Sequence, residues 1–324
     1  MEDLHFRFGV MADLQYADIA DGHSHVEKTT RRYRQSLNIL EQAREFFDEQ
    51  HTAVNVLLGD LVDAKSQPNH DAALAAVLSR LKPREKFNLV HGNHDLTCFP
   101  RPKVFSDYLP ATARYTLPTT GKVLYYSTSP HPEWRFIFLD ALDVSAFNAS
   151  TDACRVSAEE LLTKMNPNLL GEKFHGNWFE GLNDDRRRFV PYNGGLGEEQ
   201  MSWLRRELYD AETSGLNCII FCHLPCYARC VDSSGLLWNA EDVLALVQSF
   251  KTVKAFFAGH DHSGGYAVCE SGIHHVIPPA PLECELGQVA FGTIAVGASE
   301  GRLEWRGKGT RTGDAWPPAF LKWR

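Results

Sequence analysis

Residues 53–63, AVNVLLGDLVD, contain the pattern that decides the fold. The segment opens with a short apolar run of alanine, valine and leucine, which is typical of a buried β-strand. The run ends at a glycine, and two aspartates, Asp60 and Asp63, follow it closely. Because ligands of layered α/β proteins bind at the carboxyl ends of strands, this segment predicts a strand with a polar site at its end.

Strand and helix patterns alternate on both sides of this segment. We expect strands over residues 5–13, 53–60 and 86–93. Amphipathic helices are expected between them, over residues 26–50 and 70–81. This order is the βαβαβ pattern of a layered α/β protein.

The second half of the chain continues the alternation and then changes to strands alone. We expect strands over 135–141, 217–223 and 253–260, helices over 198–212 and 239–250, and then strands without helices over 265–270, 274–279, 288–296 and 301–307. Residues 142–197 interrupt the pattern, since they are rich in Asn, Asp and Gly and contain one predicted helix, at 157–165. Long irregular insertions in compact domains often carry specificity. We therefore expect a single domain over residues 1–324 with a specificity insertion at about 142–197.

Composition and charge argue against several classes of protein. The 324 residues are 44% hydrophobic and 23% charged, which is ordinary for a globular protein with a sizeable core. The net charge of −8 argues against a basic face that grips nucleic acid. The first residues, MEDLHFRFGV, do not resemble a signal peptide, and no apolar run approaches the roughly 20 residues that span a bilayer. We expect a cytoplasmic monomer that binds neither nucleic acid nor membrane and keeps its eight cysteines reduced.

Polar side chains follow five of the expected strands. They are Asp13 and Gln15; Asp60 and Asp63; Asn93, His94 and Asp95; His223; and His260 and His262. The last pair, in AFFAGHDHSGG, also suits a simple turn, because glycine and aspartate are common turn residues. Five such clusters at five strand ends can nevertheless converge on one ligand.

The residue types in these clusters are those of a site for divalent metal ions. Carboxylate, amide and imidazole groups are ligands for Mn, Fe or Zn, and no thiolate belongs to the set. The candidate ligands are Asp13, Gln15, Asp60, Asn93, His223, His260 and His262. They are more than one ion needs, so two ions that share Asp60 are expected. For Gln15 the alternative is a side chain that points to bulk water.

The order and spacing of these blocks resemble the calcineurin-like metallophosphoesterase superfamily. The matching blocks are Asp13-Leu14-Gln15, Gly59-Asp60-Leu61-Val62-Asp63, Gly92-Asn93-His94-Asp95, His223 and Gly259-His260-Asp261-His262. The resemblance implies a layered α/β (α+β) fold, a β-sandwich flanked by helices, with a dinuclear metal site at the strand ends.

The resemblance also implies a division of the ligands between two ions. Asp13, Asp60 and His262 would hold the first ion, with Gln15 where most of the family has histidine. Asp60, Asn93, His223 and His260 would hold the second. Because an amide oxygen is a harder ligand than imidazole, Gln15 favours Mn or Mg over Zn. We expect two divalent ions, with Mn as the first choice and Mg, Fe or Zn as alternatives.

Roles for the remaining polar residues follow from hydrolysis at phosphorus. Two adjacent ions ionise a water and clamp the phosphoryl oxygens. His94 would donate a proton to the leaving oxygen, with Asp95 orienting it, and the alternative for His94 is a histidine that caps a turn. Asp63 would orient a ligand or Asn93, and Asp261 is assigned to the turn or to a neighbouring histidine.

Further residues are similar to one branch of the superfamily, the manganese-dependent ADP-ribose/CDP-alcohol diphosphatases. They are Asp13-Leu14-Gln15 followed by YADI, the basic helix start at 31–34, and YNGGLGEEQMSWL at 192–204. The resemblance implies cleavage of ADP-ribose to AMP and ribose 5-phosphate, and of CDP-alcohols such as CDP-choline to CMP and a phosphoalcohol. Cyclic ADP-ribose would be a side substrate. The alternatives are a cyclic-nucleotide phosphodiesterase and a non-catalytic nucleotide-binding scaffold.

A nucleoside diphosphate also needs a pocket for its base and its second half. We expect substrate contacts from Asn193, Gly194, Gly195 and Leu196, with Cys226, Tyr227 and Cys230 facing them. The insertion offers further candidates in Phe174, His175, Trp178, Phe179 and Arg186 to Arg188. For these, packing of the aromatics and a solvated basic face are equally good interpretations. The even spacing of Cys222, Cys226 and Cys230 suggests a metal site, but structural zinc sites usually pair two cysteine knuckles and the sequence shows no second one, so buried thiols are favoured.

Overall fold

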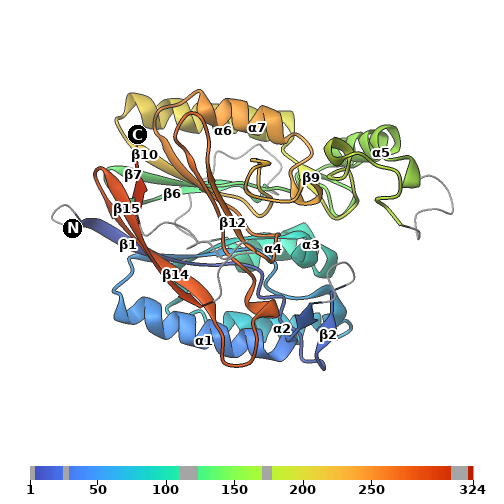
Figure 1. The fold of residues 1–324 in the computed structure, drawn as a ribbon, viewed down its shortest axis with the longest axis horizontal. Helices are drawn as coiled ribbons and strands as arrows, with labels where there is room; N and C mark the ends of the chain where they lie inside the picture. Colours follow the sequence, from blue (N-terminus) through green and yellow to red (C-terminus); the bar gives the residue numbers. More distant parts are fainter. Residues whose placement is uncertain (1–3, 25–28, 110–122, 170–176, 308–319, 324) are drawn as a thin grey trace.

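Two six-stranded sheets face each other in the computed structural model, which describes residues 4–24, 29–109, 123–169, 177–307 and 320–323 (Figure 1). The first sheet has the order β16 (Phe320–Lys322), β15 (Glu300–Gly307), β14 (Ala290–Gly297), β1 (Leu4–Met11), β4 (Val54–Leu58) and β5 (Phe87–Val90). The second has the order β12 (Gly265–Val268), β13 (His274–Ile277), β11 (Val253–Phe257), β10 (Asn217–Phe221), β7 (Trp134–Phe138) and β6 (Tyr126–His131).

The first sheet is parallel on one side and antiparallel on the other, and the second has a parallel centre with antiparallel edge strands. Strands β1, β4 and β5 run parallel, and so do β7, β10, β11 and β13. Strand β14 pairs antiparallel with β1, and β6 and β12 pair antiparallel with β7 and β13. The parallel strands therefore deliver the residues that follow them to one end of each sheet, where ligand sites of this architecture form.

Aromatic side chains fill the space between the two sheets. Phe8 of β1 meets Phe136 of β7 with ring centroids 5.1 Å apart, and Phe138 stacks on Phe221 of β10 at 5.0 Å. These rings are buried together with branched aliphatic side chains such as Val56. Alternation along the strands turns one side chain in two toward this layer, which explains the aromatic and β-branched composition of the strands.

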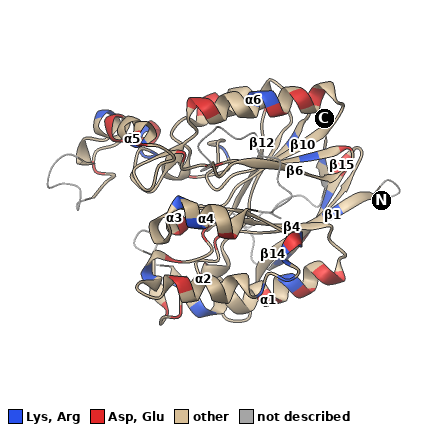
Figure 2. Cartoon of the chain, turned by 180° about the vertical axis from the view of Figure 1, so that it is seen from behind, with Lys and Arg blue, Asp and Glu red and all other residues tan. Residues whose placement is uncertain are grey.

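Helices cover the outer face of each sheet. Helix α1 (Tyr33–Glu49) packs against the first sheet with α2 (His70–Leu78) and α4 (Arg101–Tyr108), and α3 (Asn93–Cys98) follows β5. Helices α6 (Glu198–Thr213) and α7 (Ala240–Gln248) cover the second sheet. Positions occupied by Lys, Arg, Asp and Glu are frequent along these outer helices (Figure 2). The predicted helix-flanked β-sandwich is confirmed.

Some element boundaries differ from those that the sequence predicts. The helix expected from residue 26 begins at Tyr33, because β3 (Thr30–Arg31) pairs with β2 (Gly22–His23) just before it. Helix α4 and the edge strands β6 and β16 are not predicted. Strand β6 has the sequence YSTSPH, which lacks the apolar run of a central strand and is extended through its pairing with β7.

The insertion is closed at its base by a short pair of strands. Strand β8 (Val144–Ser145) pairs antiparallel with β9 (Gly194–Gly195). Helix α5 (Asp152–Met165) lies between them in the sequence and extends beyond the end of the sandwich (Figure 1). It starts five residues before the predicted helix, because the Thr151 hydroxyl accepts a hydrogen bond from the Cys154 amide and caps the first turn. Its buried face packs against Phe189 and Trp238.

Among the described residues, no helix is both long and apolar enough to cross a bilayer.

Candidate dinuclear metal centre

Several candidate ligands occupy an unusual backbone conformation directly after their strands. The φ angles of Asp13, Gln15, Asp60 and His260 are 49°, 41°, 52° and 70°, in the left-handed region that non-glycine residues rarely adopt. Such conformations cost about 1–3 kcal/mol each and collect at functional sites. Backbone hydrogen bonds hold these conformations; for example, the backbone N–H of Gln15 donates to the Asp60 carbonyl at 2.7 Å. The chain is thus forced into sharp turns that aim these side chains inward.

Asp60 lies at the centre of the cluster. Its Oδ1 accepts from the His94 backbone N–H at 2.8 Å, and its Oδ2 lies 3.5 Å from the His223 Nε2. Asp13, Asp60 and His223 offer ligand atoms that all lie within 4.8 Å of one another, and all three residues are buried. The described part of the chain therefore brings two carboxylates and an imidazole together where the sequence predicts a metal site.

The electrostatics of the two carboxylates call for a cation. Burial raises the pKa of Asp13 to about 6, although His223 and His262 oppose the rise. Burial also disfavours the charged form of Asp60, but His223 and His94 outweigh it and hold the pKa of Asp60 well below its usual value. Buried carboxylates are costly unless a positive charge or a metal ion compensates them.

His223 has one ring nitrogen fixed and the other free for a ligand role. Its Nδ1 donates to the Leu58 carbonyl at 2.8 Å, and its Nε2 lies 3.2 Å from the Asn93 Oδ1. Two glycines leave room for this arrangement. A Cβ on Gly59 would stand 2.6 Å from the His223 ring, and one on Gly92 would collide with the Asp60 carboxylate. His223, Asn93 and Asp60 thus form one half of the site.

His262 belongs to the other half, beside Asp13 and Gln15. Its Nδ1 donates to Glu283 Oε1 at 2.8 Å, and its Nε2 lies 3.9 Å from Asp13 Oδ1. Arg31 also contacts Glu283, at 3.3 Å. Burial would raise the pKa of Glu283, but His262 and Arg31 lower it to about 2. This carboxylate–histidine pair fixes the ring so that Nε2 faces the site, as second partners of metal-binding histidines do.

Gln15 supplies the clearest sign that a metal ion fits here. Its side chain is only 1% exposed, so the alternative in which it points to bulk water is wrong. Its Nε2 lies 2.9 Å from His262 Nε2 and 3.1 Å from Asp60 Oδ2, whereas its Oε1 is buried with no hydrogen-bond partner. A rotation of the amide by 180° would turn Oε1 toward the same two groups, where an ion would need an oxygen ligand.

Replacing Gln15 by histidine is expected to shift the metal preference from Mn toward Zn by on the order of tenfold, because imidazole is a softer ligand than an amide oxygen. Competitive dialysis of the metal-free protein against both ions measures the shift. Gln42→His is the control, since Gln42 lies exposed on α1. An unchanged preference in Gln15→His would show that residue 15 does not contact the ion.

His260 approaches the site from the opposite side. Its ring centroid lies 5.1 Å from that of His223, and its Nε2 lies 2.9 Å from Asn193 Oδ1. Its backbone N–H donates to Asp13 Oδ2 at 3.0 Å, which joins the end of β11 to the end of β1. Asp261, between the two histidines, accepts from the Ser263 amide at 3.0 Å, so its side chain serves the turn.

The prediction that Asp95 orients the His94 ring is wrong, because the Asp95 carboxylate contacts other groups. Its carboxylate accepts from the backbone amides of Asp60, Leu61 and Gly92 at 2.8–2.9 Å, and from the Tyr108 hydroxyl at 2.8 Å. Asp95 thus holds the two ligand-bearing loops together and does not orient the His94 ring. The sequence could not show this, because Asp95 follows His94 in the chain but its carboxylate points to other residues.

Asp63 lies next to the His94 ring instead. The His94 Nδ1 accepts from the Ala64 amide at 3.1 Å, and Asp63 Oδ2 lies 3.4 Å from the same nitrogen. The prediction that Asp63 orients a ligand or Asn93 is therefore corrected to a contact with His94. Because Nδ1 accepts, Nε2 carries the proton of the neutral ring, and the side chain is 22% exposed. His94 is therefore positioned to donate.

The predicted substrate residues are buried in the free protein. Leu196, Cys226, Tyr227 and Cys230 belong to the apolar cluster beneath α6 and α7. Gly194 and Gly195 form β9, and Asn193 is fully buried. These positions favour packing over a lining of an open pocket. Burial also raises the pKa of the Cys226 thiol well above its usual value, as expected of a packing cysteine.

Of the other candidate substrate residues in the insertion, some pack within it and one lies near the site. Phe174 and His175 lie outside the described residues. Arg188 pairs with Glu241 at 2.6 Å, and Arg187 stacks on the Phe179 ring at 5.2 Å. Tyr192, which the sequence does not single out for this role, lies next to His260 with ring centroids 5.7 Å apart, and the Trp178 ring lies 6.0 Å beyond it.

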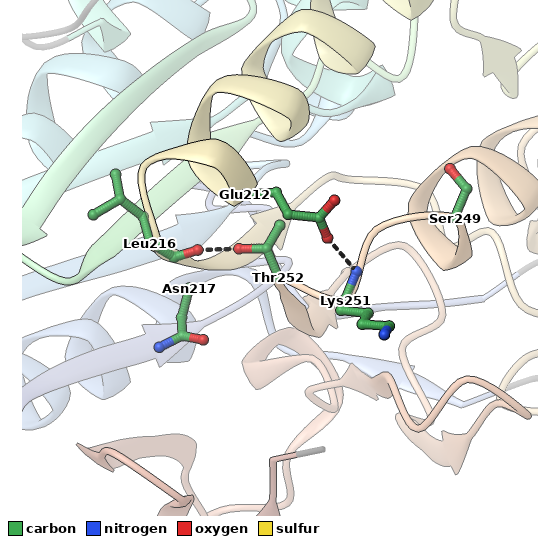
Figure 3. A pocket seen from close by; sticks show the side chains of 7 residues that line it. Glu212, Leu216, Asn217, Ser249, Lys251 and Thr252 are labelled. Carbon is green, nitrogen blue, oxygen red and sulfur yellow. Dashed lines mark hydrogen bonds between the residues drawn. The ribbon is translucent and has the colours of Figure 1, made fainter.

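A separate surface pocket carries no metal ligand. It is lined by Glu212, Gly215, Leu216, Asn217, Ser249, Lys251 and Thr252 (Figure 3). It lies at the amino end of β10, whereas His223 follows the carboxyl end of that strand. The contacts within it, such as the Lys251 amide on Glu212 at 2.8 Å, join α6 to the turn after α7. It is therefore distinct from the site described above.

Comparison with known proteins identifies the family of the chain. A profile of the family described as calcineurin-like phosphoesterase matches residues 6–264. The manganese-dependent ADP-ribose/CDP-alcohol diphosphatase of Oryza sativa subsp. japonica is 40% identical over 297 residues, which are 90% of this chain and 88% of that protein. The protein of the same name from Danio rerio is 33% identical and covers 95% of this chain and 97% of its own length.

A solved structure shows the same arrangement of elements. The crystal structure of a dimetal phosphatase from Danio rerio matches with a TM-score of 0.89 and 30% identity, over 99% of this chain and 100% of that chain. The resemblance inferred from the sequence motifs is thereby confirmed. The chain belongs to the calcineurin-like phosphoesterase family.

Proposed function

We propose that this chain is a manganese-dependent hydrolase that cleaves the diphosphate bridge of ADP-ribose and of CDP-alcohols, including CDP-choline. The products would be AMP and ribose 5-phosphate in the first case, and CMP and a phosphoalcohol in the second. The observation that carries the proposal is the buried cluster of Asp13, Asp60 and His223, with His94 hydrogen-bonded through its backbone N–H to Asp60. Relatives that match 90% and 95% of this chain bear the diphosphatase name.

The residues that follow the strand ends supply the proposed ligands, and the grouping of Asp13, Asp60 and His223 supports this. Asp13, Gln15, Asp60 and His262 would hold one ion, and Asp60, Asn93, His223 and His260 the other. When bound, two such ions lower the pKa of a water and neutralise charge on the phosphoryl oxygens. The position of Asp60 supports this division, because its Oδ2 lies 3.1 Å from Gln15 Nε2 on one side and 3.5 Å from His223 Nε2 on the other.

His94 is the proposed general acid of the reaction. One bond forms between the water oxygen and phosphorus, and the bond from that phosphorus to the bridging oxygen breaks. The leaving phosphate then takes up a proton. His94 Nε2–H supports this role, because Nδ1 is occupied by the Ala64 amide and the ring is partly exposed. Asp63 beside Nδ1 would stabilise positive charge on the ring.

The finer properties of the protein remain part of the proposal. We infer a cytoplasmic monomer that acts on small molecules and binds neither nucleic acid nor membrane. The net charge of −8 supports the absence of a polyanion partner, and the eight free cysteines suit a reducing compartment. We also infer one domain over residues 1–324 with the specificity insertion at about 142–197, which the β8–β9 pairing at its base supports.

Hydrolysis in ¹⁸O-labelled water with Mn²⁺ tests the reaction. With ADP-ribose and CDP-choline as substrates, we expect label in the phosphate of one product and none in the sugar or alcohol, because the water attacks phosphorus. Faster turnover of 3′,5′-cyclic nucleotides would favour a cyclic-nucleotide phosphodiesterase instead. No turnover of any phosphoester with Mn²⁺ bound would favour the non-catalytic scaffold.

A further inference from the structure

Asn193 connects three parts of the chain through its side chain. Its Nδ2 donates to the Arg188 carbonyl at 2.9 Å, within the insertion, and to the Ser234 carbonyl at 2.6 Å, in the loop before α7. Its Oδ1 lies 2.9 Å from His260 Nε2. The side chain is fully buried, so water does not compete for these contacts.

These contacts fix the protonation of the His260 ring. Because both donors of the Asn193 amide are taken by carbonyl oxygens, its Oδ1 faces His260 and can only accept. The His260 Nε2 must therefore carry the proton and donate it. Nδ1 is then the nitrogen with the free electron pair, and a metal ion binds only to such a nitrogen.

We propose that Asn193 is a positioning residue for the second metal ion: it holds His260 with Nε2–H toward the amide and Nδ1 toward the ion. Because the same side chain ties down the insertion and the loop at Ser234, metal binding at His260 is coupled to the packing of both segments. Such coupling is reciprocal, so the metal ion also stabilises the packed insertion. The inference rests on the proposed ligand set and not on the identity of the substrate.

The test is a titration of the metal-free protein with Mn²⁺ alone, followed by equilibrium dialysis and electron paramagnetic resonance. Asn193→Leu removes the acceptor and is expected to lower the affinity for one of the two ions by about 10–100-fold, which is the usual effect of losing the partner of a metal-binding histidine. Asn193→Asp keeps an acceptor for Nε2–H but loses both donors to the carbonyls of Arg188 and Ser234, so it is expected to retain more affinity than Asn193→Leu but less than the unmodified protein. His260→Ala serves as the reference for loss of that ion.

Asn166 provides a matched structural control. It is also a buried asparagine of the insertion, and its amide donates to the Phe189 and Trp178 carbonyls at 2.8 and 3.1 Å, while its Oδ1 accepts from the Asn168 amide. Its contacts are with backbone groups and not with a candidate ligand. Asn166→Leu is therefore expected to leave Mn²⁺ affinity unchanged, even where it lowers the melting temperature.

Several outcomes would overturn the proposal. Wild-type Mn²⁺ affinity in Asn193→Leu, an equal loss in Asn166→Leu, or two ions retained by His260→Ala would each do so. A further measurement uses the unmodified protein and so does not depend on folding of a variant. Nitrogen-15 resonances of the metal-free enzyme are expected to show His260 protonated at Nε2, and the opposite tautomer would contradict the assignment. Because no substrate is present, these results stand apart from any failure of the proposed diphosphatase activity.

Discussion

Replacing Asp60 by asparagine is expected to reduce diphosphate hydrolysis by at least about 10³-fold, because metal ions contribute several kcal/mol to stabilisation of such a transition state. Asp60 is the one candidate ligand assigned to both ions. Its Oδ2 lies 3.1 Å from Gln15 Nε2 and 3.5 Å from His223 Nε2, so the carboxylate stands between the two halves of the site. The asparagine side chain has the same size but only one oxygen and no charge, so it cannot bind both ions as the carboxylate would.

The Asp60→Asn enzyme should bind fewer than two Mn²⁺ ions in the absence of substrate. Steady-state hydrolysis of ADP-ribose and metal content after dialysis measure both effects. Asp261→Asn is the matched control, because Asp261 lies between two candidate ligands but its carboxylate accepts from the Ser263 backbone N–H of its own turn. Two tightly bound ions and an unchanged rate in Asp60→Asn would remove Asp60 from the centre of the site.

The sequence predicts the strand ends and the ligand types because both depend on local patterns. Apolar runs identify β4 and β11, and the polar residues that follow them, such as Asp60 and His260, are fixed by their position after the strand. Converging strand ends then bring these residues together, whatever the details of packing. This is why Asp13, Asp60 and His223 lie close together.

The partners of these ligands do not follow from the sequence. Glu283 contacts His262 across a distance of 21 residues, and Asn193 contacts His260 from the insertion. Asp95 and Asp63 exchange the roles expected from their order, because the turn after β5 places the His94 ring beside Asp63. Each of these contacts depends on how separate loops pack against one another, and the hydrophobic periodicity of a single segment does not predict that packing.

The backbone conformation at the site also needs tertiary structure to exist. Left-handed geometry is favoured by glycine, so Asp13, Gln15 and Asp60 would not be expected to adopt it. Asp95 offsets part of this cost, since its carboxylate accepts from the amides of Asp60 and Leu61. Hydrogen bonds to a charged group contribute about 1.5–3 kcal/mol each, which is comparable to the strain. The carboxylate expected to act in catalysis thus maintains the geometry of the ligands.

His94→Ala is expected to lower the rate of ADP-ribose hydrolysis by about 10²–10⁴-fold while both Mn²⁺ ions remain bound, which is the range for loss of a general acid. The contact of residue 94 with Asp60 is made by the backbone N–H, so alanine preserves it. The imidazole with its Nε2–H is removed, and the leaving phosphate must depart without a proton.

The dependence on the leaving group separates this role from a structural one. The nitrophenyl ester of a nucleotide is a useful second substrate, because its leaving group departs as the stable nitrophenolate anion and needs no proton. His94→Ala should therefore lose much less activity on this ester than on ADP-ribose. Asp63→Asn should show a smaller effect of the same kind, because Asp63 acts through the His94 ring at 3.4 Å. An equal loss on both substrates would mean that His94 binds or positions the phosphates, and a wild-type rate on ADP-ribose would remove it from the reaction.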